Sequence, residues 1–541
     1  MPLIDEYLEL QEKYQKKYGD KTIVLYECGQ FFEIYGIEND YEKVGKIYEI
    51  ADITNLSVSK RGGKKEPVSR KNPLMAGFPN HSFEKWKNIL LKHKYTVIKI
   101  EQSNNGEKCP ERNITEIISP GINLDTTHFT NNLMSIYLEE INHNLGKTIL
   151  YAGISIIDIT TGENSVYDIK GKTNDKNYTL EEIFRCIQTH NPTEIIINTE
   201  NLITITKDYI INYLEISNRP YHYNNFEDFK YLLENKYKNK FLDKLFPKHN
   251  MISTVEYLDL NLLFWGLSSY IYLLQFAYEH NEYIINKLSK PKIWNTSKNL
   301  ILSYDSINQL NVIPNKNIQI NTKYDCLFNL LDNTSTCIGK RLLKTNLLNP
   351  ILSIDELNNR YDLVEMMNME QDGERIYIKI ENYLNKIFDI DRLHRKISLG
   401  IIDPSHFTNL DLSYRFINKI IEYIENIDNI KIKTLLPKIE TIRQYKLFIN
   451  DYNECLDMDK LHGCSQNNIK ETFFKHGIFE DIDNLQEKID NCFLFFNELA
   501  EFLSNKLSIN KSIDIKSNDR DGYYFYTTKK RGEMLKKNVN S

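Results

Sequence analysis

The sequence lacks the marks of disulfide-rich, zinc-binding and membrane-spanning chains. Its eight cysteines are scattered over 541 residues without a C-x-x-C pair, and no histidine completes a zinc-ligand spacing. No secretory signal peptide opens it, and no apolar stretch of about 20 residues could span a bilayer. We therefore expect an intracellular protein in a reducing compartment, without a membrane partner. These features do not distinguish cytoplasm, nucleus, organelle and viral replication site.

An excess of positive charge is also missing. The formal net charge is −6 and the pI is about 6.1, so no global basicity indicates nucleic acid as a partner. Any contact with DNA must then come from local basic patches. The chain is too long for a single hydrophobic core, and its length predicts roughly three to five domains.

A nucleotide-binding P-loop is absent as well. The pattern G-x-x-x-x-G-K-S/T is needed because backbone amides cradle the phosphates while the lysine and the hydroxyl serve the γ-phosphate and Mg²⁺. Two G-K-T triplets occur, at 146–148 and 171–173, but Ile141 and Val166 stand where the first glycine is required. The sequence therefore predicts no catalytic residue and no cofactor or metal site in this chain.

What the sequence does contain is an aromatic residue and a carboxylate two positions apart, within the segment G-Q-F-F-E-I-Y at 29–35. In a strand, residues two apart point to the same face, so Phe31 and Glu33 share a surface while Phe32 and Ile34 turn inward. An aromatic ring can wedge into a base step, which costs less where the base is already mismatched. A carboxylate beside phosphates is useful only if it hydrogen-bonds a base edge. The alternative is a half-buried edge strand with a solvated glutamate.

A family resemblance supports the first interpretation. Residues 29–33 resemble the G-D-F-Y-E segment of the DNA mismatch repair protein MutS, whose F-x-E pair reads the mismatch. Four further signatures of that family, L-T-x-R-G, M-A-G-I-P-Y-H-A, E-Q and T-P-G, resemble in the same order residues 56–62, 75–82, 101–102 and 118–121. The resemblance implies that Phe31 and Glu33 bind the mismatch.

The chain departs from these signatures at Gln30, which replaces Asp, at Asn80, which replaces Tyr, and in a lysine-rich insertion between Arg61 and Pro73. The basic residues of this stretch are Lys60, Arg61, Lys64, Lys65, Arg70 and Lys71. Beside a mismatch wedge, the first four are candidates for contact with the DNA backbone, because phosphate neutralisation supplies most non-specific affinity. The alternative is a solvated loop.

The pattern after the first domain predicts a second α/β domain. Residues 149–158 are apolar enough for a central strand, and 160–163 indicate a turn into the next strand. A helix at 180–190 then leads to a strand at 194–197. This arrangement resembles the connector domain of the MutS family, which implies a surface for repair partners.

The region that follows is helix-rich and resembles the core and lever of the same family. Residues 330–343 resemble L-L-D-x-T-x-T-x-M-G-x-R-L-L, and 389–393 match D-L-E-R-L. We expect Asp332 and Thr334 to cap a helix, and Gly339 to let helices approach closely. These residues build a lever and perform no chemistry.

A coiled arm and a clamp complete the chain. Apolar residues in 482–503 step by three and four, a heptad seam that needs a partner helix, and 416–427 are a candidate. Residues 522–528 resemble the family's clamp strand G-Y-Y-I-x-I-T. The basic residues that follow, candidates for DNA contact unless they form only a solvated tail, are Lys529, Lys530 and Arg531. Because Ser541 falls where a sheet is expected to continue, we interpret the chain as a fragment or truncated product.

The predicted fold class is multidomain, with two N-terminal α/β domains followed by an all-α lever or core domain and the start of a helical and β clamp. The expected bounds are 1–122 for a mismatch-recognition domain, 123–255 for a connector, 256–467 for the lever, and 468–541 for an incomplete clamp.

The resemblance implies recognition of mismatched DNA in DNA mismatch repair, with Phe31 as the wedge and Glu33 hydrogen-bonded to a base. The expected partner is double-stranded DNA with mismatches or small loops. Full-length family members couple this to ATP hydrolysis, so ATP, Mg²⁺ and a homodimer or heterodimer are expected only with an ATPase domain beyond Ser541. Two alternatives stay open: a protein that binds branched or recombining DNA without mismatch specificity, and a repair scaffold.

Overall fold

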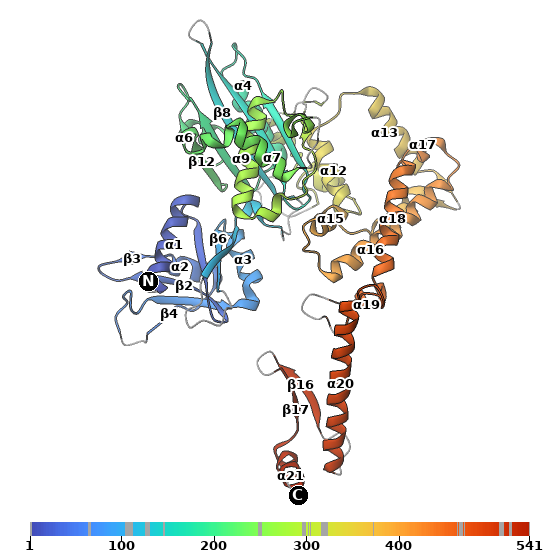
Figure 1. Cartoon of the computed structure of the whole chain (residues 1–541). Helices are drawn as coiled ribbons and strands as arrows, with labels where there is room; N and C mark the ends of the chain where they lie inside the picture. Colours follow the sequence, from blue (N-terminus) through green and yellow to red (C-terminus); the bar gives the residue numbers. More distant parts are fainter. Residues whose placement is uncertain are drawn as a thin grey trace. The chain divides into compact units, whose positions relative to one another are not determined.

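The chain folds into two compact units, residues 1–401 and 402–541, in the computed structural model (Figure 1). The structure describes residues 3–62, 66–102, 112–124, 130–143, 147–246, 252–294, 299–300, 302, 304–314, 323–371, 373–462, 464, 469, 471–507, 513–518 and 522–539. No helix within these ranges is long and apolar enough to cross a membrane. The bounds of the four domains expected from the sequence stay a prediction.

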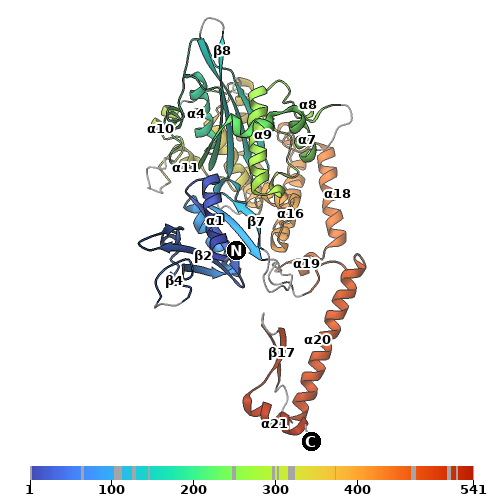
Figure 2. The ribbon, with the colours of Figure 1, turned by 60° about the vertical axis from the view of Figure 1, so that its left-hand side comes forward.

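The first module of the larger unit surrounds a mixed seven-stranded sheet with the order β4-β5-β2-β1-β6-β7 and with β3 paired to β2. The strands are β1 (Thr22–Cys28), β2 (Phe31–Glu38), β3 (Lys43–Val44), β4 (Ser59–Lys60), β5 (Leu74–Pro79), β6 (Thr96–Gln102) and β7 (Arg112–Ile118). Helix α1 (Leu3–Tyr18) covers one face, as Figure 2 shows, while α2 (Ile47–Thr54) and α3 (Phe83–Lys92) cover the other. Strand β1 is therefore buried on both faces, which explains its continuous apolar run.

A second sheet, of six strands, has the order β12-β11-β8-β9-β10-β13. The strands are β8 (Asn132–His143), β9 (Lys147–Asp158), β10 (Asn164–Ile169), β11 (Glu194–Glu200), β12 (Tyr221–Asn225) and β13 (Lys292–Ile293). The helices around it are α4 (Tyr178–His190), α5 (Lys207–Tyr213), α6 (Phe226–Phe229), α7 (Asn235–Leu245), α8 (Thr254–Tyr257) and α9 (Phe264–His280). Helices α4 and α5 pack on one face and α7 and α9 on the other. The predicted strands at 149–158 and 194–197 and the predicted helix at 180–190 are confirmed.

The two sheets are joined by a buried carboxylate. Glu194 of β11 accepts a hydrogen bond from the Ser119 hydroxyl and one of 2.9 Å from the Gly121 amide, and its other oxygen lies 2.7 Å from Nε2 of His222. Burial alone raises the pKa of Glu194, but the hydrogen bond and the charge interaction with His222, with a smaller contribution from Ser119, outweigh it and hold that pKa below its ordinary value. The last of the family signatures, at 118–121, is thus a structural joint.

Another buried histidine, His280 of α9, belongs to the same joint. Its ring packs against Tyr18 of α1 at 4.9 Å and against Phe276 at 4.1 Å between centroids. Burial lowers the pKa of His280 to about 4. The folded protein therefore holds this ring neutral where an unfolded chain would protonate it.

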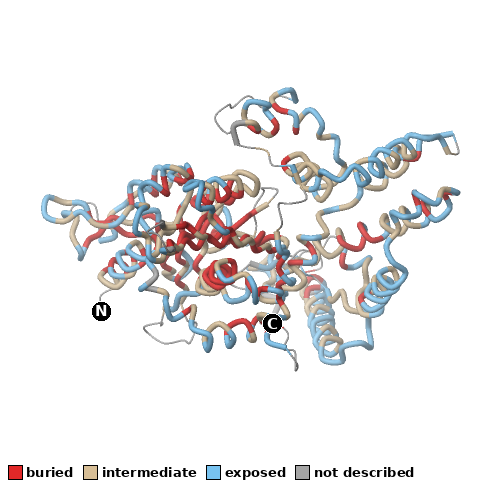
Figure 3. Tube along the Cα trace, turned by 90° about the horizontal axis from the view of Figure 1, so that it is seen from above, coloured by how far each residue is buried: buried red, intermediate tan, exposed pale blue. Residues whose placement is uncertain are grey.

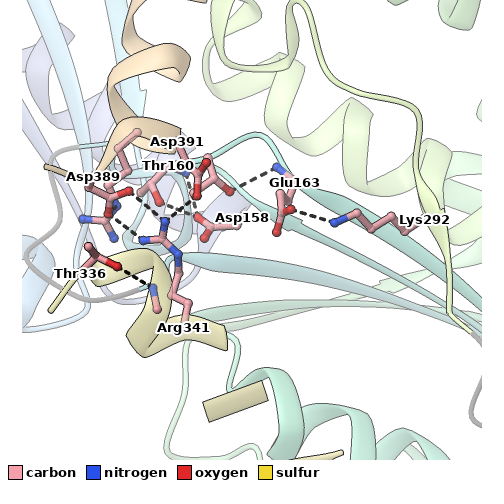
Figure 4. Close-up of polar contacts among 11 residues, drawn as sticks. Asp158, Thr160, Glu163, Lys292, Thr336, Arg341, Asp389 and Asp391 are labelled. Atoms are coloured by element: carbon pink, nitrogen blue, oxygen red, sulfur yellow. Dashed lines mark hydrogen bonds and ion pairs between the residues drawn. The ribbon is translucent and has the colours of Figure 1, made fainter. Parts of the chain in front are cut away.

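The helices that follow form the lever part of the larger unit. They are α10 (Tyr304–Gln309), α11 (Leu327–Leu331), α12 (Cys337–Leu348), α13 (Ile354–Met367), α14 (Ile376–Leu384) and α15 (Ile390–Ser398), with a short ladder of β14 (Glu370–Gln371) and β15 (Glu374–Arg375). Figure 4 shows Arg341 of α12 reaching the carboxylates that open α15. Its guanidinium contacts both oxygens of Asp389, at 2.7 and 2.8 Å, and Asp391 at 2.8 Å. The residues that match D-L-E-R-L therefore connect helix α15 to helix α12.

Of the two residues expected to cap a helix, Asp332 is the C-cap of α11, while Thr334 caps neither α11 nor α12. Thr336 is the N-cap of α12, and its Oγ1 accepts a 3.0 Å hydrogen bond from the Gly339 amide. The Asp332 side chain forms an ion pair with Lys340 and accepts a hydrogen bond from the Thr334 hydroxyl. A Cβ at position 339 would lie 3.1 Å from the Thr336 hydroxyl, so Gly339 makes room for the cap of its own helix.

A buried arginine ties the lever to the second sheet's module. Arg395 of α15 donates to the carbonyl oxygens of Asn286, at 2.9 Å, and of Ile284. Burial lowers the pKa of Arg395 to about 10, so the guanidinium still carries its charge at neutral pH. Backbone carbonyl dipoles therefore compensate this charge.

The smaller unit is helical and ends in a hairpin and a further helix. Its elements are α16 (Pro404–Glu425), α17 (Ile430–Lys433), α18 (Ile439–Cys455), α19 (Met458–Leu461), α20 (Glu480–Lys506), β16 (Asp514–Asn518), β17 (Gly522–Tyr526) and α21 (Lys529–Val539). The predicted seam lies on α20, where Leu485 and Ile489 are exposed. In both ribbon views α20 extends away from α16, so the partner helix proposed for it is wrong. The expectation of continuing sheet after β17 is also wrong, because the lysine-rich tail is a good helix former.

Buried residues gather in the two sheet modules, as the red segments of Figure 3 show, while the surface of α20 is mostly exposed. All three tryptophans, Trp86, Trp265 and Trp294, lie within residues 1–401. Tryptophan fluorescence therefore reports the unfolding of the larger unit alone.

Acidification should destabilise the larger unit because folding holds His280 neutral. The unfolded chain gains a proton below the ordinary pKa of 6.5 while the folded chain does not until about 4, so the free energy of unfolding falls as the pH falls through this window. From pH 7.5 to pH 5.0 the loss from this side chain is about 2 kcal/mol. Urea titrations followed by tryptophan fluorescence at the two pH values measure it.

His280→Gln should reduce the pH slope, because an amide does not titrate. Part of the slope remains, since burial also lowers the pKa of His190 to about 4. His81→Gln is the matched control, as His81 is exposed. An unchanged slope in His280→Gln would contradict the assignment.

Candidate nucleic-acid interface

The predicted site residues lie at the tip of the hairpin formed by β1 and β2. Cys28 pairs with Phe31 across this hairpin, so the turn consists of Gly29 and Gln30 alone. Gly29 has a φ of +64°, in the region that favours glycine at the first position of a two-residue turn. Such a short turn fixes the register of the two strands.

The alternation expected for β2 is confirmed. Phe32 is 3 % exposed and packs against Phe78 at 6.0 Å and Phe83 at 5.1 Å between ring centroids. Phe31 points to the opposite face and is 47 % exposed, and Glu33 on its face is half-buried. An exposed aromatic ring at the start of a buried strand gains little from the core.

Glu33 has a defined environment on this face. It lies opposite Gly77 of β5, where a Cβ would come within 2.8 Å of the Phe32 carbonyl oxygen and 3.2 Å of the Glu33 Cγ. A side chain at position 77 would therefore crowd Glu33. The hydroxyl of Tyr35, two residues further along β2, donates a hydrogen bond to the Glu33 carboxylate.

Two other family signatures brace the hairpin tip. The Asn80 side chain donates to Oε1 of Glu27 at 2.5 Å, and its backbone amide donates to the Gln30 carbonyl at 2.9 Å. From the other side, the backbone amide of Gln102 donates to Oε2 of Glu27 at 2.7 Å, and its side chain accepts from the Gly29 amide at 3.3 Å. Sequence reasoning missed Glu27 as the anchor, and it used positions 80 and 102 only as signatures, although both carry amides able to bind a strand end.

The basic residues predicted near the hairpin are only partly placed. Lys60 donates to the Glu66 carbonyl at 2.9 Å, and the exposed Arg61 guanidinium lies over the Tyr35 ring at 5.5 Å. Arg61 therefore lies beside Tyr35, on the hairpin that carries Phe31 and Glu33. The two lysines at 64 and 65, Lys64 and Lys65, fall outside the described residues.

Another basic residue of the same insertion has a structural role. Arg70 forms ion pairs with Asp5 of α1 at 2.7 Å and with Glu42 at 2.6 Å. Two carboxylates thus neutralise it, and it contributes little to a positive surface.

The basic residues of the smaller unit open helix α21. Lys529 and Lys530 are exposed and Arg531 is half-buried, and none of the three is in an ion pair with another residue of the described ranges. Positive side chains in the first turn oppose the helix dipole, which an anion there would relieve. This arrangement suits a phosphate, but it does not select a base.

The chain does not fit a nucleotide phosphate at either G-K-T triplet. Lys147 and Thr148 begin strand β9, and Lys172 lies over the Tyr178 ring at 3.7 Å instead of opening a helix. Because a P-loop lysine and hydroxyl must lie at a helix N-terminus, neither triplet has the geometry of a P-loop.

Comparison with known proteins agrees with this arrangement. Residues 1–127 match MutS domain I, and residues 305–512 match MutS domain III. A protein of Acanthamoeba polyphaga mimivirus described as a DNA mismatch repair protein mutS homolog is 32 % identical over 99 % of the chain and 50 % of its own length. The DNA mismatch repair proteins MutS of Caldanaerobacter subterraneus and Clostridioides difficile are 26 % and 25 % identical over 98 % and 99 % of the chain.

The fold is thus that of a multidomain protein in which two α/β modules precede a helical region. With both domain matches and these relatives, the chain belongs to the MutS family. It spans about half the length of the curated relatives it matches, with 50 %, 55 % and 51 % of those three proteins covered.

Phe31→Ala should leave the fold of the larger unit almost unchanged, while Phe32→Ala should not. The exposed ring contributes little burial, so its loss should change the free energy of unfolding by less than about 1 kcal/mol. Removal of the buried Phe32 ring leaves a cavity and typically costs ~3–5 kcal/mol. Urea titration followed by fluorescence measures both, and Trp86 is a local probe because it packs on Phe78 at 5.7 Å. Equal losses in the two variants would show that Phe31 is a core residue.

Proposed function

We propose that this chain recognises mispaired double-stranded DNA in mismatch repair, with Phe31 as a wedge and Glu33 as the hydrogen-bonding partner of a base. One observation carries the proposal: an exposed aromatic ring and an oriented carboxylate share one face of a braced hairpin tip. The names of the relatives support it, since they describe DNA mismatch repair proteins.

The wedge works through the cost of opening a base step. Inserting a ring between stacked bases costs a few kcal/mol, and less where the base pair is already mismatched. The ring then regains roughly 1–3 kcal/mol by stacking on a base. The stacking energy is the same at every base step, but the cost of opening the step is lower at a mispair. The site therefore binds the mispair more tightly.

The carboxylate adds selectivity at the expense of affinity. Near DNA phosphates a negative charge is repelled, so Glu33 weakens binding to any duplex. A hydrogen bond between its carboxyl group and a base edge offsets this only where the base is displaced enough to be reached. The net effect is to penalise matched DNA more than mismatched DNA.

Basic side chains supply the affinity that does not depend on sequence. Arg61 beside the hairpin, and Lys529, Lys530 and Arg531 on α21, are proposed to contact phosphates, together with Lys60, Lys64 and Lys65. A role for ATP and Mg²⁺ is proposed on the family relationship alone. Assembly as a dimer and contact of the second module with repair partners are proposed on the family relationship alone.

Phe31→Ala should abolish mismatch preference, because it removes the stacking ring. The loss in affinity for a G·T duplex is about one to two decades, from roughly 1–3 kcal/mol of stacking. Fluorescence anisotropy on the G·T duplex and its matched counterpart measures it. Tyr48→Ala is a matched control, since Tyr48 of α2 is 48 % exposed. The proposal would be contradicted if the wild-type chain shows no measurable preference for the G·T duplex, or if Phe31→Ala keeps that preference.

Glu33→Ala should shrink the mismatch preference without weakening the binding of matched DNA. Removing the carboxylate removes its repulsion from phosphates, so matched affinity holds or rises while the base contact is lost. The same two duplexes at 50 and 150 mM salt test this, since screening reduces the repulsion. An equal loss of affinity on both duplexes is the result that contradicts a base contact.

A further inference from the structure

The third residue on the face of Phe31 and Glu33 is Tyr35, and its ring is firmly held. The residue is 1 % exposed, and the ring meets Tyr7 of α1 edge to face, at 5.2 Å between centroids and 82° between planes. The Arg61 guanidinium covers it at 5.5 Å. A ring fixed by α1 on one side and a cation on another presents its hydroxyl in one direction only.

That hydroxyl links two other side chains of the hairpin. It donates to Oε2 of Glu33, and the Cys28 sulfur lies 3.4 Å from the Tyr35 oxygen. A carboxylate can only accept, so the single hydroxyl proton points to Glu33 and leaves the oxygen free to accept from the Cys28 thiol. Burial raises the pKa of Tyr35, and it raises the pKa of Cys28 as well, so both groups keep their protons at neutral pH.

The consequence concerns the freedom of the Glu33 side chain. An unrestrained glutamate loses rotamer entropy when it is fixed. Here the hydroxyl of Tyr35 fixes the carboxylate before DNA arrives, and Gly77 leaves the space that this conformation needs. A side chain ordered in advance costs less to order on binding.

We propose that Tyr35 is a positioning residue for mismatch discrimination, acting through the hydrogen-bond chain Cys28–Tyr35–Glu33 to hold the reading carboxylate in place. The inference rests on the proposed function, because it gives the Glu33 carboxyl group its role. It goes beyond it by assigning part of the selectivity to a buried residue that cannot touch DNA.

Tyr35→Phe tests the proposal because it keeps the ring and removes the hydroxyl. The ratio of G·T to matched affinity should fall roughly three- to tenfold, with matched affinity within about twofold of wild type. Tyr7→Phe is the matched control: it removes a hydroxyl from the same core cluster, one that donates to the Val24 carbonyl at 3.3 Å and not to Glu33. Its ratio should stay at the wild-type value.

A double-mutant cycle separates positioning from packing. If Tyr35 acts through Glu33, then Tyr35→Phe should change the ratio by less than about twofold once Glu33→Ala is present. Three results would overturn the inference and leave the proposed function standing. Tyr35→Phe could change the ratio equally in both backgrounds, or it could leave the ratio unchanged while Glu33→Ala alters it. It could also weaken binding to both duplexes equally. A wild-type chain without mismatch preference would overturn both, so the two failures are distinguishable.

Discussion

The pairing of β2 on both of its edges is the constraint on which the site depends. Strand β2 lies between β1 and β5, so its backbone groups are bonded on each side and its register cannot slip. A slip by one residue would exchange the faces of Phe31 and Phe32 and would turn the Glu33 carboxylate toward the core, at the cost of burying a charge. The cost of this slip keeps Phe31 outside. The exposed ring is stable in its place although its own contacts contribute little.

The modules of the larger unit meet through buried polar groups that bond to backbone. Glu194 accepts a hydrogen bond from the Gly121 amide at one joint, and Arg395 donates a hydrogen bond to the Asn286 carbonyl at another. Such contacts are weak evidence for stability, because desolvation of the charge offsets much of the gain. Their directionality instead fixes how one module is oriented on the next.

Much of this architecture follows from local pattern. Alternation in β2, the apolar run at 149–158 and the heptad spacing on α20 are properties of neighbouring residues, so the sequence predicts them. The Glu194 joint is not predictable, since two of its partners, Ser119 and Gly121, lie more than seventy positions away in the chain. The bond from Tyr35 to Glu33 was open to prediction from the period of two, but nothing in the sequence says that the hydroxyl is buried. A heptad seam likewise does not name its partner.

The shortness of the turn between β1 and β2 limits how this lineage can evolve. A residue inserted beside Gly29 would change the hairpin register and exchange the outward and inward faces of one strand relative to the other. The short turn therefore favours change by substitution at the hairpin tip over gradual lengthening. Length variation is tolerated where strands are not coupled through a tight turn, and the lysine-rich insertion after β4 lies in such a place. Within one domain, the turn between β1 and β2 thus accommodates substitutions, while the segment after β4 accommodates insertions.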